Sequence, residues 1–325
     1  MKPLLEVENL RAHFFMPSGV LKAADGVSFQ IQPGEIVALA GESGSGKSVT
    51  TQCIMRLLPS PGRIVEGAIR FKGEDLLSLS PEEMRRIRGR HISVVLQDAM
   101  AALNPVIPVG EQVADILLAH TSDSVKQAWE KAVELLGKMG IPRARERANY
   151  YAHEFSGGMQ QRVVISTALA CNPELIIADE PTTALDVTIQ LQILSLLLEA
   201  RDKMGSAILY ISHDLATAVS ICDRIMIMYA GEIVESAPTR EILTNPMHPY
   251  ARGLIDSIPS LGERPMEFLR AIPGFPPNPM DLPSTCRFAP RCSYVKDECL
   301  ARGPELVERV PGHHVRCFLD EQGLK

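Results

Sequence analysis

The sequence predicts an α/β fold, in which helices cover a sheet. Short apolar runs of the kind found in buried strands recur along the chain, at residues 35–40, 92–96, 175–178, 207–211 and 225–229. Segments with helical spacing follow several of these runs, and such an alternation favours a sheet covered by helices. The chain has 325 residues, 46% of them hydrophobic, which is enough for a sizeable core.

A helical segment is expected to interrupt this domain between about residues 98 and 158, where the strand signal disappears. Residues 124–139 place five apolar side chains at helical spacing, namely Val125, Trp129, Ala132, Val133 and Leu136. The composition changes beyond about residue 240, because twelve of the 24 prolines fall in the last 85 residues. Proline at that density opposes long helices and central strands, so we predict a domain over residues 1–240 and a loop-rich extension over 241–325.

The octapeptide GESGSGKS, residues 41–48, lies between an apolar strand and a helical run, as the phosphate-binding motif G-x-x-x-x-G-K-[ST] requires. Its glycines let backbone amides turn inward and, with the N-terminus of the next helix, form a cradle for anions. Lys47 supplies a positive charge for the β- and γ-phosphates, and the hydroxyl of Ser48 is placed to bind Mg²⁺. The predicted nucleotide contacts are Gly41, Glu42, Ser43, Gly44, Ser45, Gly46, Lys47, Ser48 and Val49.

A second motif, LIIADEP at residues 175–181, supplies two carboxylates at the end of a buried strand. The carboxyl ends of strands form the edge where an α/β sheet binds ligands, so Asp179 can hold the Mg²⁺ shell there. Neighbouring side chains of an extended segment point to different sides. Glu180 can therefore face a water molecule and act as the general base that activates it against the γ-phosphate.

The segment FSGGMQQR, residues 155–162, predicts a further anion-binding helix start, with Ser156 as the N-cap and exposed amides at Gly157 and Gly158. In its order and spacing with the other motifs, this segment resembles the signature of ABC-type ATPases. The remaining family motifs are matched by Gln97 (Q-loop), by Ala184, Leu185 and Asp186 (D-loop) and by His213 (switch histidine). The likeness covers about residues 4–235. It implies a P-loop ATPase fold with a RecA-like sheet core and a helical subdomain, to which the composition adds the loop-rich C-terminal extension.

The family implies that two such domains face each other head to tail with ATP and Mg²⁺ between them, each signature contacting the nucleotide held by the opposite domain. The resemblance assigns Phe14 to stacking on adenine and Asp186 to the nucleotide site. It gives Gln97 a contact with Mg²⁺ and with the transport subunit, and it gives His213 a hydrogen bond to the γ-phosphate. The sequence departs from the general signature at Met159, where a thioether replaces an amide that can donate a hydrogen bond.

Residues 228–259 resemble a segment of oligopeptide and dipeptide importer ATPases, most clearly at His248, Pro249 and Tyr250. This resemblance implies the ATP-hydrolysing subunit of a bacterial peptide importer, with glutathione, opines or nickel as alternative substrates. A second ATPase subunit, making a heterodimer or a homodimer, two transmembrane permease subunits and an extracytoplasmic solute-binding protein would complete the importer. A soluble ABC ATPase that acts on nucleic acid or ribosomes is the alternative outside transport.

The composition bears on where the chain works. No apolar run approaches the eighteen or so residues of a membrane helix, and the first residues lack the apolar stretch of a signal peptide. We therefore expect a cytoplasmic chain, held peripherally at the inner face of the plasma membrane by its partners. The net charge of -6 disfavours a protein that coats nucleic acid, and no nucleic acid partner is expected.

Four of the seven cysteines crowd the last forty residues: Cys286, Cys292, Cys299 and Cys317. Four thiolates can bind a tetrahedral Zn²⁺ ion or a [4Fe–4S] cluster, and either would hold together a segment too small for a core. His313 and His314 are alternative ligands, and cysteines that are unligated or transiently oxidised are a third interpretation. The family resemblance favours the iron–sulfur cluster.

Overall fold

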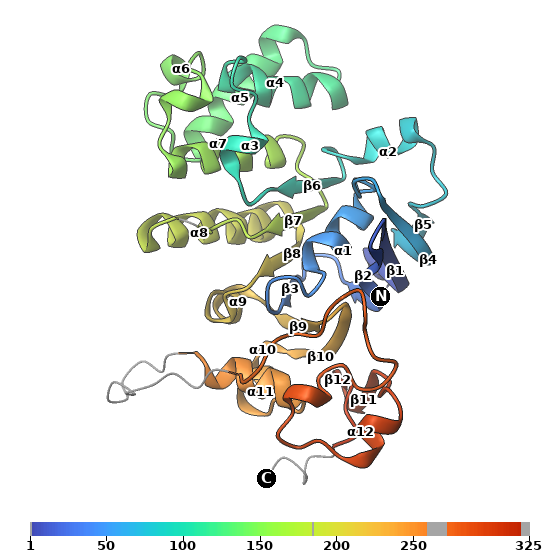
Figure 1. Ribbon diagram of the computed structural model, residues 1–325. Helices are drawn as coiled ribbons and strands as arrows, with labels where there is room; N and C mark the ends of the chain where they lie inside the picture. Colours follow the sequence, from blue (N-terminus) through green and yellow to red (C-terminus); the bar gives the residue numbers. More distant parts are fainter. Residues whose placement is uncertain (1, 184, 259–271, 320–325) are drawn as a thin grey trace, which may run out of the picture. The chain divides into compact units, whose positions relative to one another are not determined.

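The computed structural model describes residues 2–183, 185–258 and 272–319. The chain divides into two compact units, both of which combine helices and strands (Figure 1). The first unit contains Met1–Leu4, Ile31–Ile36 and Ser78–Tyr210, and the second contains Leu5–Gln30, Val37–Leu77 and Ile211–Lys325. The predicted α/β fold class is confirmed, and the second unit joins the phosphate-binding motif to the C-terminal residues.

The first unit contains a short parallel sheet and most of the helices. Its strands lie in the order β8 (Ala207–Ser212), β7 (Leu175–Asp179) and β6 (Ile92–Val95), with β8 continuing into the second unit. Ile92 pairs with Leu175 in the parallel register of β6 and β7. The helices are α2 (Pro81–Ile87), α3 (Ala99–Ala102), α4 (Val109–His120), α5 (Val125–Lys138), α6 (Ala144–Arg147), the 3₁₀ turn η1 (Ala152–Glu154), α7 (Gly157–Leu169) and α8 (Val187–Met204).

The expected helical segment is present, and helix α5 shows how its sequence specifies it. Ser124 caps the helix and forms a capping box with Gln127, so two amides at the helix start are satisfied. The side chains of Ala132, Val133 and Leu136 are buried, as their spacing predicts. Val125 stands at the same spacing but is 73% exposed, because it lies in the first turn at the open end of the helix.

The second unit contains two sheets. The first is antiparallel and has the order β2 (Gly19–Ile31), β1 (Leu5–Met16), β4 (Gly62–Phe71) and β5 (Glu74–Asp75). Leu5 pairs with Phe71 at one end of the β1–β4 ladder and Phe14 pairs with Gly62 at the other. The apolar runs of the sequence do not predict this sheet, because burial alternates along β1 and β2 and leaves no continuous apolar stretch.

The second sheet of this unit has the order β11 (Val307–Val310), β12 (His313–Val315), β10 (Glu232–Pro238), β9 (Arg224–Tyr229) and β3 (Ile36–Ala40). Strands β3 and β9 are parallel, and β9, β10, β12 and β11 pair antiparallel in turn. The boundary at residue 240 and the loop-rich character of the extension stay predictions, and among the described residues of the extension strand β12 extends the sheet at β10. The remaining helices of the unit are α1 (Lys47–Ile54), α9 (Leu215–Ile221), α10 (Thr239–Thr244), α11 (Pro249–Asp256), the 3₁₀ turn η2 (Ala289–Arg291) and α12 (Asp297–Ala301).

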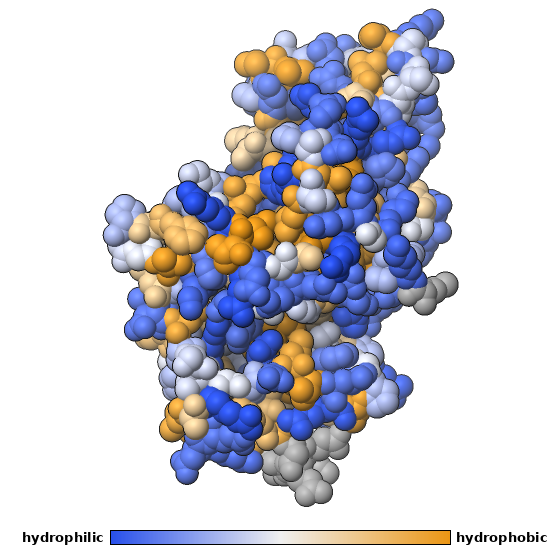
Figure 2. Space-filling model, turned by 90° about the vertical axis from the view of Figure 1, so that its right-hand side faces the viewer, coloured by the Kyte–Doolittle hydropathy of each residue, from blue (hydrophilic) through white to orange (hydrophobic). Residues whose placement is uncertain are grey.

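The face drawn in Figure 2 is mostly hydrophilic, and apolar side chains gather on it in patches. Within the described residues, no helix has both the length and the apolar character that crossing a bilayer requires.

Candidate functional site

The phosphate loop joins strand β3 to helix α1, and its backbone geometry requires glycine. Gly41 and Gly46 have φ angles of 150° and 106°. A Cβ atom at Gly41 would lie 2.2 Å from the carbonyl oxygen of Met228, and one at Gly46 would lie 2.1 Å from that of Ala23. Because both neighbours are backbone atoms, the loop keeps this close path only with glycine at these two positions.

The polar side chains of the loop are arranged as a phosphate site needs. Lys47 is the first residue of α1 and is 5% exposed, and its Nζ donates to the carbonyl oxygens of Gly41, at 2.8 Å, and Glu42, at 2.9 Å. The Oγ atom of Ser45 is buried and has no hydrogen-bond partner among the described residues. A buried cation and an unpaired hydroxyl beside a glycine cradle fit a polyphosphate group.

The other loop residues and two further predicted contacts, Phe14 and His213, lie in the same unit. Ser43, Gly44 and Ser48 are exposed, and Val49 is half-buried in the first turn of α1. His213 is exposed directly after β8.

The predicted adenine contact lies in β1, next to a second aromatic residue. Phe14 is half-buried, and its Cε1 atom lies 2.8 Å from the place where Gly62 would carry a Cβ. Phe15 is 44% exposed, and the guanidinium of Arg63 lies 5.7 Å from its ring centroid. The assignment of Phe14 to adenine stacking stays a prediction.

In the first unit, the structure brings Gln97 and Glu180 together. Nε2 of Gln97 donates to Oε2 of Glu180 at 3.0 Å, and Oγ1 of Thr183 donates to the same oxygen at 3.1 Å. Asp179 ends strand β7, and Glu180 follows in the left-handed region with φ 48°. Because β6 and β7 are parallel, Gln97 after β6 and the acidic pair after β7 emerge at the same edge of the sheet.

The signature segment begins helix α7 with Ser156 as the N-cap, as predicted, and Ser156 and Gly157 are exposed. The Ser156 side chain makes no capping hydrogen bond, so the helix start does not consume its hydroxyl. Gly158 lies in the first turn of the helix. The sulfur of Met159 accepts a hydrogen bond from Nη1 of Arg147 at 3.3 Å. This contact holds the Met159 side chain, which replaces the amide of the general signature, against the helical segment of the same chain.

The D-loop is described only in part, because Ala184 lies outside the described residues. Asp186 is the N-cap of α8, and its Oδ1 accepts from the amide of Ile189 at 3.0 Å. Its side chain is therefore fixed by the helix that it begins.

The four C-terminal cysteines converge on one small cavity of the second unit. Cys286, Cys292, Cys299 and Cys317 line it together with His248 and aromatic residues. Burial raises the pKa of Cys286 and Cys292, and raises that of Cys317 to about 11, so these thiols are protonated at neutral pH. Among the described residues, no set of three or more His, Cys, Asp or Glu side chains is arranged to hold a metal ion.

The histidines named as alternative ligands lie elsewhere. His313 is completely buried, its Nε2 lies 2.6 Å from Oε1 of Glu235, and neither it nor His314 lines the cysteine cavity. His248 is the histidine at the cavity, and burial lowers its pKa to about 3. His248 belongs to the His-Pro-Tyr motif and is not one of the predicted ligands. That motif begins α11, with Nδ1 of His248 accepting from the amide of Tyr250.

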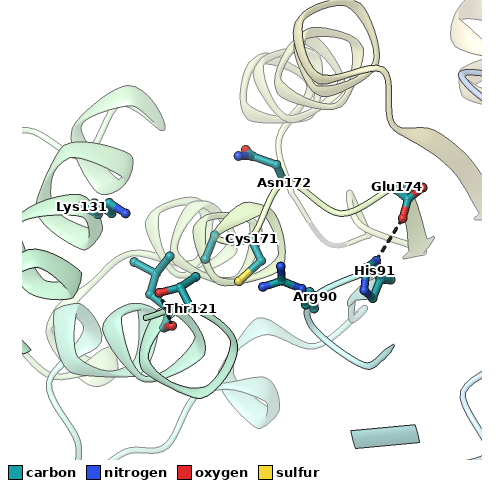
Figure 3. Close-up of a pocket in the computed structure, with 9 residues that line it drawn as sticks. Arg90, His91, Thr121, Lys131, Cys171, Asn172 and Glu174 are labelled. Atoms are coloured by element: carbon teal, nitrogen blue, oxygen red, sulfur yellow. Dashed lines mark hydrogen bonds and ion pairs between the residues drawn. The ribbon is translucent and has the colours of Figure 1, made fainter. Parts of the chain in front are cut away.

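A larger cavity of about 480 Å³ lies in the first unit, and none of its lining residues is a predicted site residue (Figure 3). Arg90 and Cys171 are among its lining residues, and an ion pair of 3.0 Å joins His91 to Glu174 at its edge. Arg90 donates to the carbonyl oxygen of His120, and Lys131 pairs with Asp123 at 2.8 Å. The cavity therefore does not offer a set of uncommitted charges for a ligand.

Comparison with known proteins places these motifs in a family. Two family models match the chain, one described as ABC transporter over residues 24–183 and one as the C-terminal region of oligopeptide/dipeptide transporters over residues 234–299. The oligopeptide transport ATP-binding protein AppD of Bacillus subtilis (strain 168) is 46% identical, over 99% of this chain and 98% of AppD. The oligopeptide transport ATP-binding protein OppD of Escherichia coli (strain K12) is 44% identical, over 97% of this chain and 93% of OppD.

A solved structure supports the same assignment. The dimeric ATP-binding cassette MJ0796, in a post-hydrolysis state bound to ADP and Pi, matches with a TM-score of 0.66 and 29% identity. The match covers 73% of this chain and 99% of MJ0796. With an intact phosphate loop, a Gln97–Glu180 pair and relatives that match along nearly the whole chain, this protein belongs to the ABC transporter ATP-binding subunits of the oligopeptide/dipeptide importer family.

Proposed function

We infer that this chain is the ATP-binding and ATP-hydrolysing subunit of a bacterial importer for di- and oligopeptides. The phosphate loop carries the inference, because Lys47 and the orphaned Ser45 hydroxyl lie beside a backbone cradle that only glycines permit. Relatives that match this chain over nearly its whole length are named as oligopeptide transport ATP-binding proteins. The names of these relatives support a peptide substrate over glutathione, opines or nickel.

The residues divide the work of ATP hydrolysis. The loop amides and Lys47 bind the phosphates, and Ser48 supplies a hydroxyl for Mg²⁺, which when bound neutralises charge on the phosphate oxygens. Glu180 accepts a proton from the attacking water, and the hydrogen bond from Gln97 orients its carboxylate. A second ATPase subunit supplies the opposing signature, so ATP binding closes the pair and hydrolysis reopens it.

Permease subunits dock near the Q-loop in this proposal. Leu96, Met100 and Val106 flank Gln97 along the chain and are 47%, 62% and 78% exposed. Large apolar side chains that are exposed to solvent suit contact with another protein. Such contacts would hold the chain at the cytoplasmic face of the membrane, with a solute-binding protein outside.

Deletion of the gene in its native host tests the transport function. We expect uptake of radiolabelled trialanine to be lost and to return with the wild-type gene but not with a Glu180→Gln variant. Excess unlabelled peptide should compete with the uptake, whereas nickel and glutathione should not. Unchanged trialanine uptake in the deletion strain would contradict a peptide importer. ATP turnover stimulated by nucleic acid or ribosomes without membranes would favour the alternative outside transport.

We further propose that the four C-terminal cysteines hold a metal centre, and that this centre is a [4Fe–4S] cluster. Their convergence on one cavity supports the donor set. Because burial raises the pKa of Cys286, Cys292 and Cys317, metal binding must release protons from these thiols, and reconstitution should improve as the pH rises from 6 to 8. Zn²⁺ is the alternative occupant of the same ligands.

Anaerobic purification with iron, sulfide and zinc analysis tests this centre. We expect about four iron atoms per chain and visible absorption around 400 nm, both lost in Cys299→Ser. A matched Cys171→Ser variant should keep them, since Cys171 lies in the other unit. Zinc without iron would replace the cluster with a zinc site, and a colourless, metal-free protein with four titratable thiols would eliminate both.

A further inference from the structure

Arg291 links the C-terminal extension to the phosphate loop. Its side chain is 4% exposed, and its guanidinium makes a two-pronged ion pair with Glu42, at 2.9 Å to Oε2 and 3.0 Å to Oε1. The other hydrogen bonds of the guanidinium go to Pro273 O (2.9 Å), Ile272 O (3.4 Å) and Tyr229 Oη (3.4 Å). The hydrogen bonds to Glu42 raise the pKa of Arg291. These contacts use all three nitrogen atoms of the planar guanidinium. The single ammonium group of a lysine cannot reproduce this geometry.

Glu42 is held by the extension at its backbone as well. Its amide donates to Oη of Tyr250 at 3.0 Å, so that the second residue of the phosphate loop is fixed by two side chains from the extension. The carbonyl oxygen of Glu42 in turn accepts from Nζ of Lys47, at 2.9 Å, and from the amide of Ser45, at 3.2 Å. The path of Glu42 therefore decides where the lysine and the loop amides point.

An aromatic cluster keeps these two side chains in place. Tyr250 packs on Tyr229 and Phe288 with ring centroids 4.6 Å and 5.4 Å apart, and Tyr229 meets Phe288 edge to face at 5.3 Å. Arg291 lies over the rings of Tyr229 and Phe288, at 5.7 Å and 5.9 Å. Phe288 also lines the cysteine cavity. One continuous packing arrangement thus runs from that cavity to the phosphate loop.

We propose that Arg291 and Tyr250 are positioning residues for ATP binding, which hold the phosphate loop in its binding conformation through Glu42. This inference rests on the proposed function, because it concerns the affinity of the same loop for nucleotide. A loop held in place before ATP arrives loses little conformational freedom on binding, so releasing Glu42 weakens nucleotide affinity. We expect nucleotide affinity to fall and the chemical step to be unaffected, since neither side chain belongs to the group around Glu180 that activates water.

Titration of the full-length chain with a fluorescent ATP analogue and Mg²⁺ tests this proposal. We expect the Kd to rise roughly tenfold or more in Arg291→Gln. The rise should be smaller in Arg291→Lys, because lysine keeps the positive charge but loses the two-pronged contact of the guanidinium. Glu42→Gln should weaken binding to a similar degree. The double variant should be no weaker than either single variant, because one interaction is being removed.

Arg287→Gln is the matched control. Arg287 is a second arginine of the same segment, and its side chain is 9% exposed. It pairs with Asp25 and Glu232 and donates to the carbonyl oxygen of Ala230, and does not contact Glu42. Its Kd should stay within about twofold of wild type. An equal rise in Arg287→Gln would mean that any loosening of the extension acts on the loop, which overturns the specific role of Arg291.

Two further outcomes separate this inference from the proposed function. If the wild-type chain binds the nucleotide and Arg291→Gln binds it equally well, the positioning role is wrong and the ATPase assignment stands. If wild type does not bind nucleotide, the proposed function itself fails. Should Arg291→Gln fold poorly, amide exchange of residues 41–48 in folded Arg291→Lys provides the readout. Faster exchange than in wild type is expected there, and unchanged exchange would contradict the proposal.

Discussion

Replacement of Glu180 by glutamine is expected to slow steady-state ATP hydrolysis by about 10²- to 10⁴-fold, the usual contribution of a general base. Glutamine has the same shape as glutamate and can still accept from Gln97 and Thr183, whose donors lie 3.0 Å and 3.1 Å from Oε2. It cannot take a proton from water. ATP affinity should therefore remain within a few-fold of wild type, because the phosphate loop is unchanged.

Hydrolysis should be measured with the ATPase assembled with its partners, and binding with the same fluorescent analogue as above. Glu174→Gln is a suitable control, since Glu174 directly precedes β7 whereas Glu180 follows it. Glu174 pairs with His91, and its loss should change turnover by less than about twofold. Near wild-type hydrolysis in Glu180→Gln would remove Glu180 from the role of base.

The phosphate loop could be predicted from the sequence because its chemistry is local. Eight consecutive residues specify the glycine turns, the lysine and the start of the helix, and the structure places them between β3 and α1 as expected. The family resemblance pointed to Gln97 as a contact for Mg²⁺ and the transport subunit, but its hydrogen bond with Glu180 was not predicted, since parallel pairing of β6 and β7 cannot be read from either segment alone.

The contacts of the extension could not be predicted in the same way. Arg291 and Glu42 are 249 positions apart, and nothing in the local pattern of either residue indicates the other. The cysteines were noticed because four of them are crowded in sequence, but their common cavity depends on Phe288 and His248 packing against each other at 5.7 Å. Strand β12 was missed because its three residues are too few to show a period.

Replacement of Glu235 by alanine is expected to release the extension from the sheet, at a cost of about 3–5 kcal/mol in local stability. Glu235 lies in β10 and is completely buried. Its carboxylate accepts from the amides of Met247 and His248, both at 2.8 Å, and from Nε2 of His313 at 2.6 Å. A carboxylate only accepts hydrogen bonds, so His313 must be the donor. Alanine would leave three buried donors without a partner.

Hydrogen exchange of the amides in β10 and β12 measures this loss directly, because a local opening that becomes easier by about 3 kcal/mol exchanges more than a hundredfold faster. Glu305→Ala provides the control, since Glu305 is an exposed carboxylate of the same extension whose loss should cost less than about 0.5 kcal/mol. Glu235 joins the start of the extension, at Met247 and His248, to its last strand, at His313. Unchanged protection of β12 in Glu235→Ala would show instead that the apolar contacts of Val315 with Met247 and Leu319 hold the strand without the buried carboxylate.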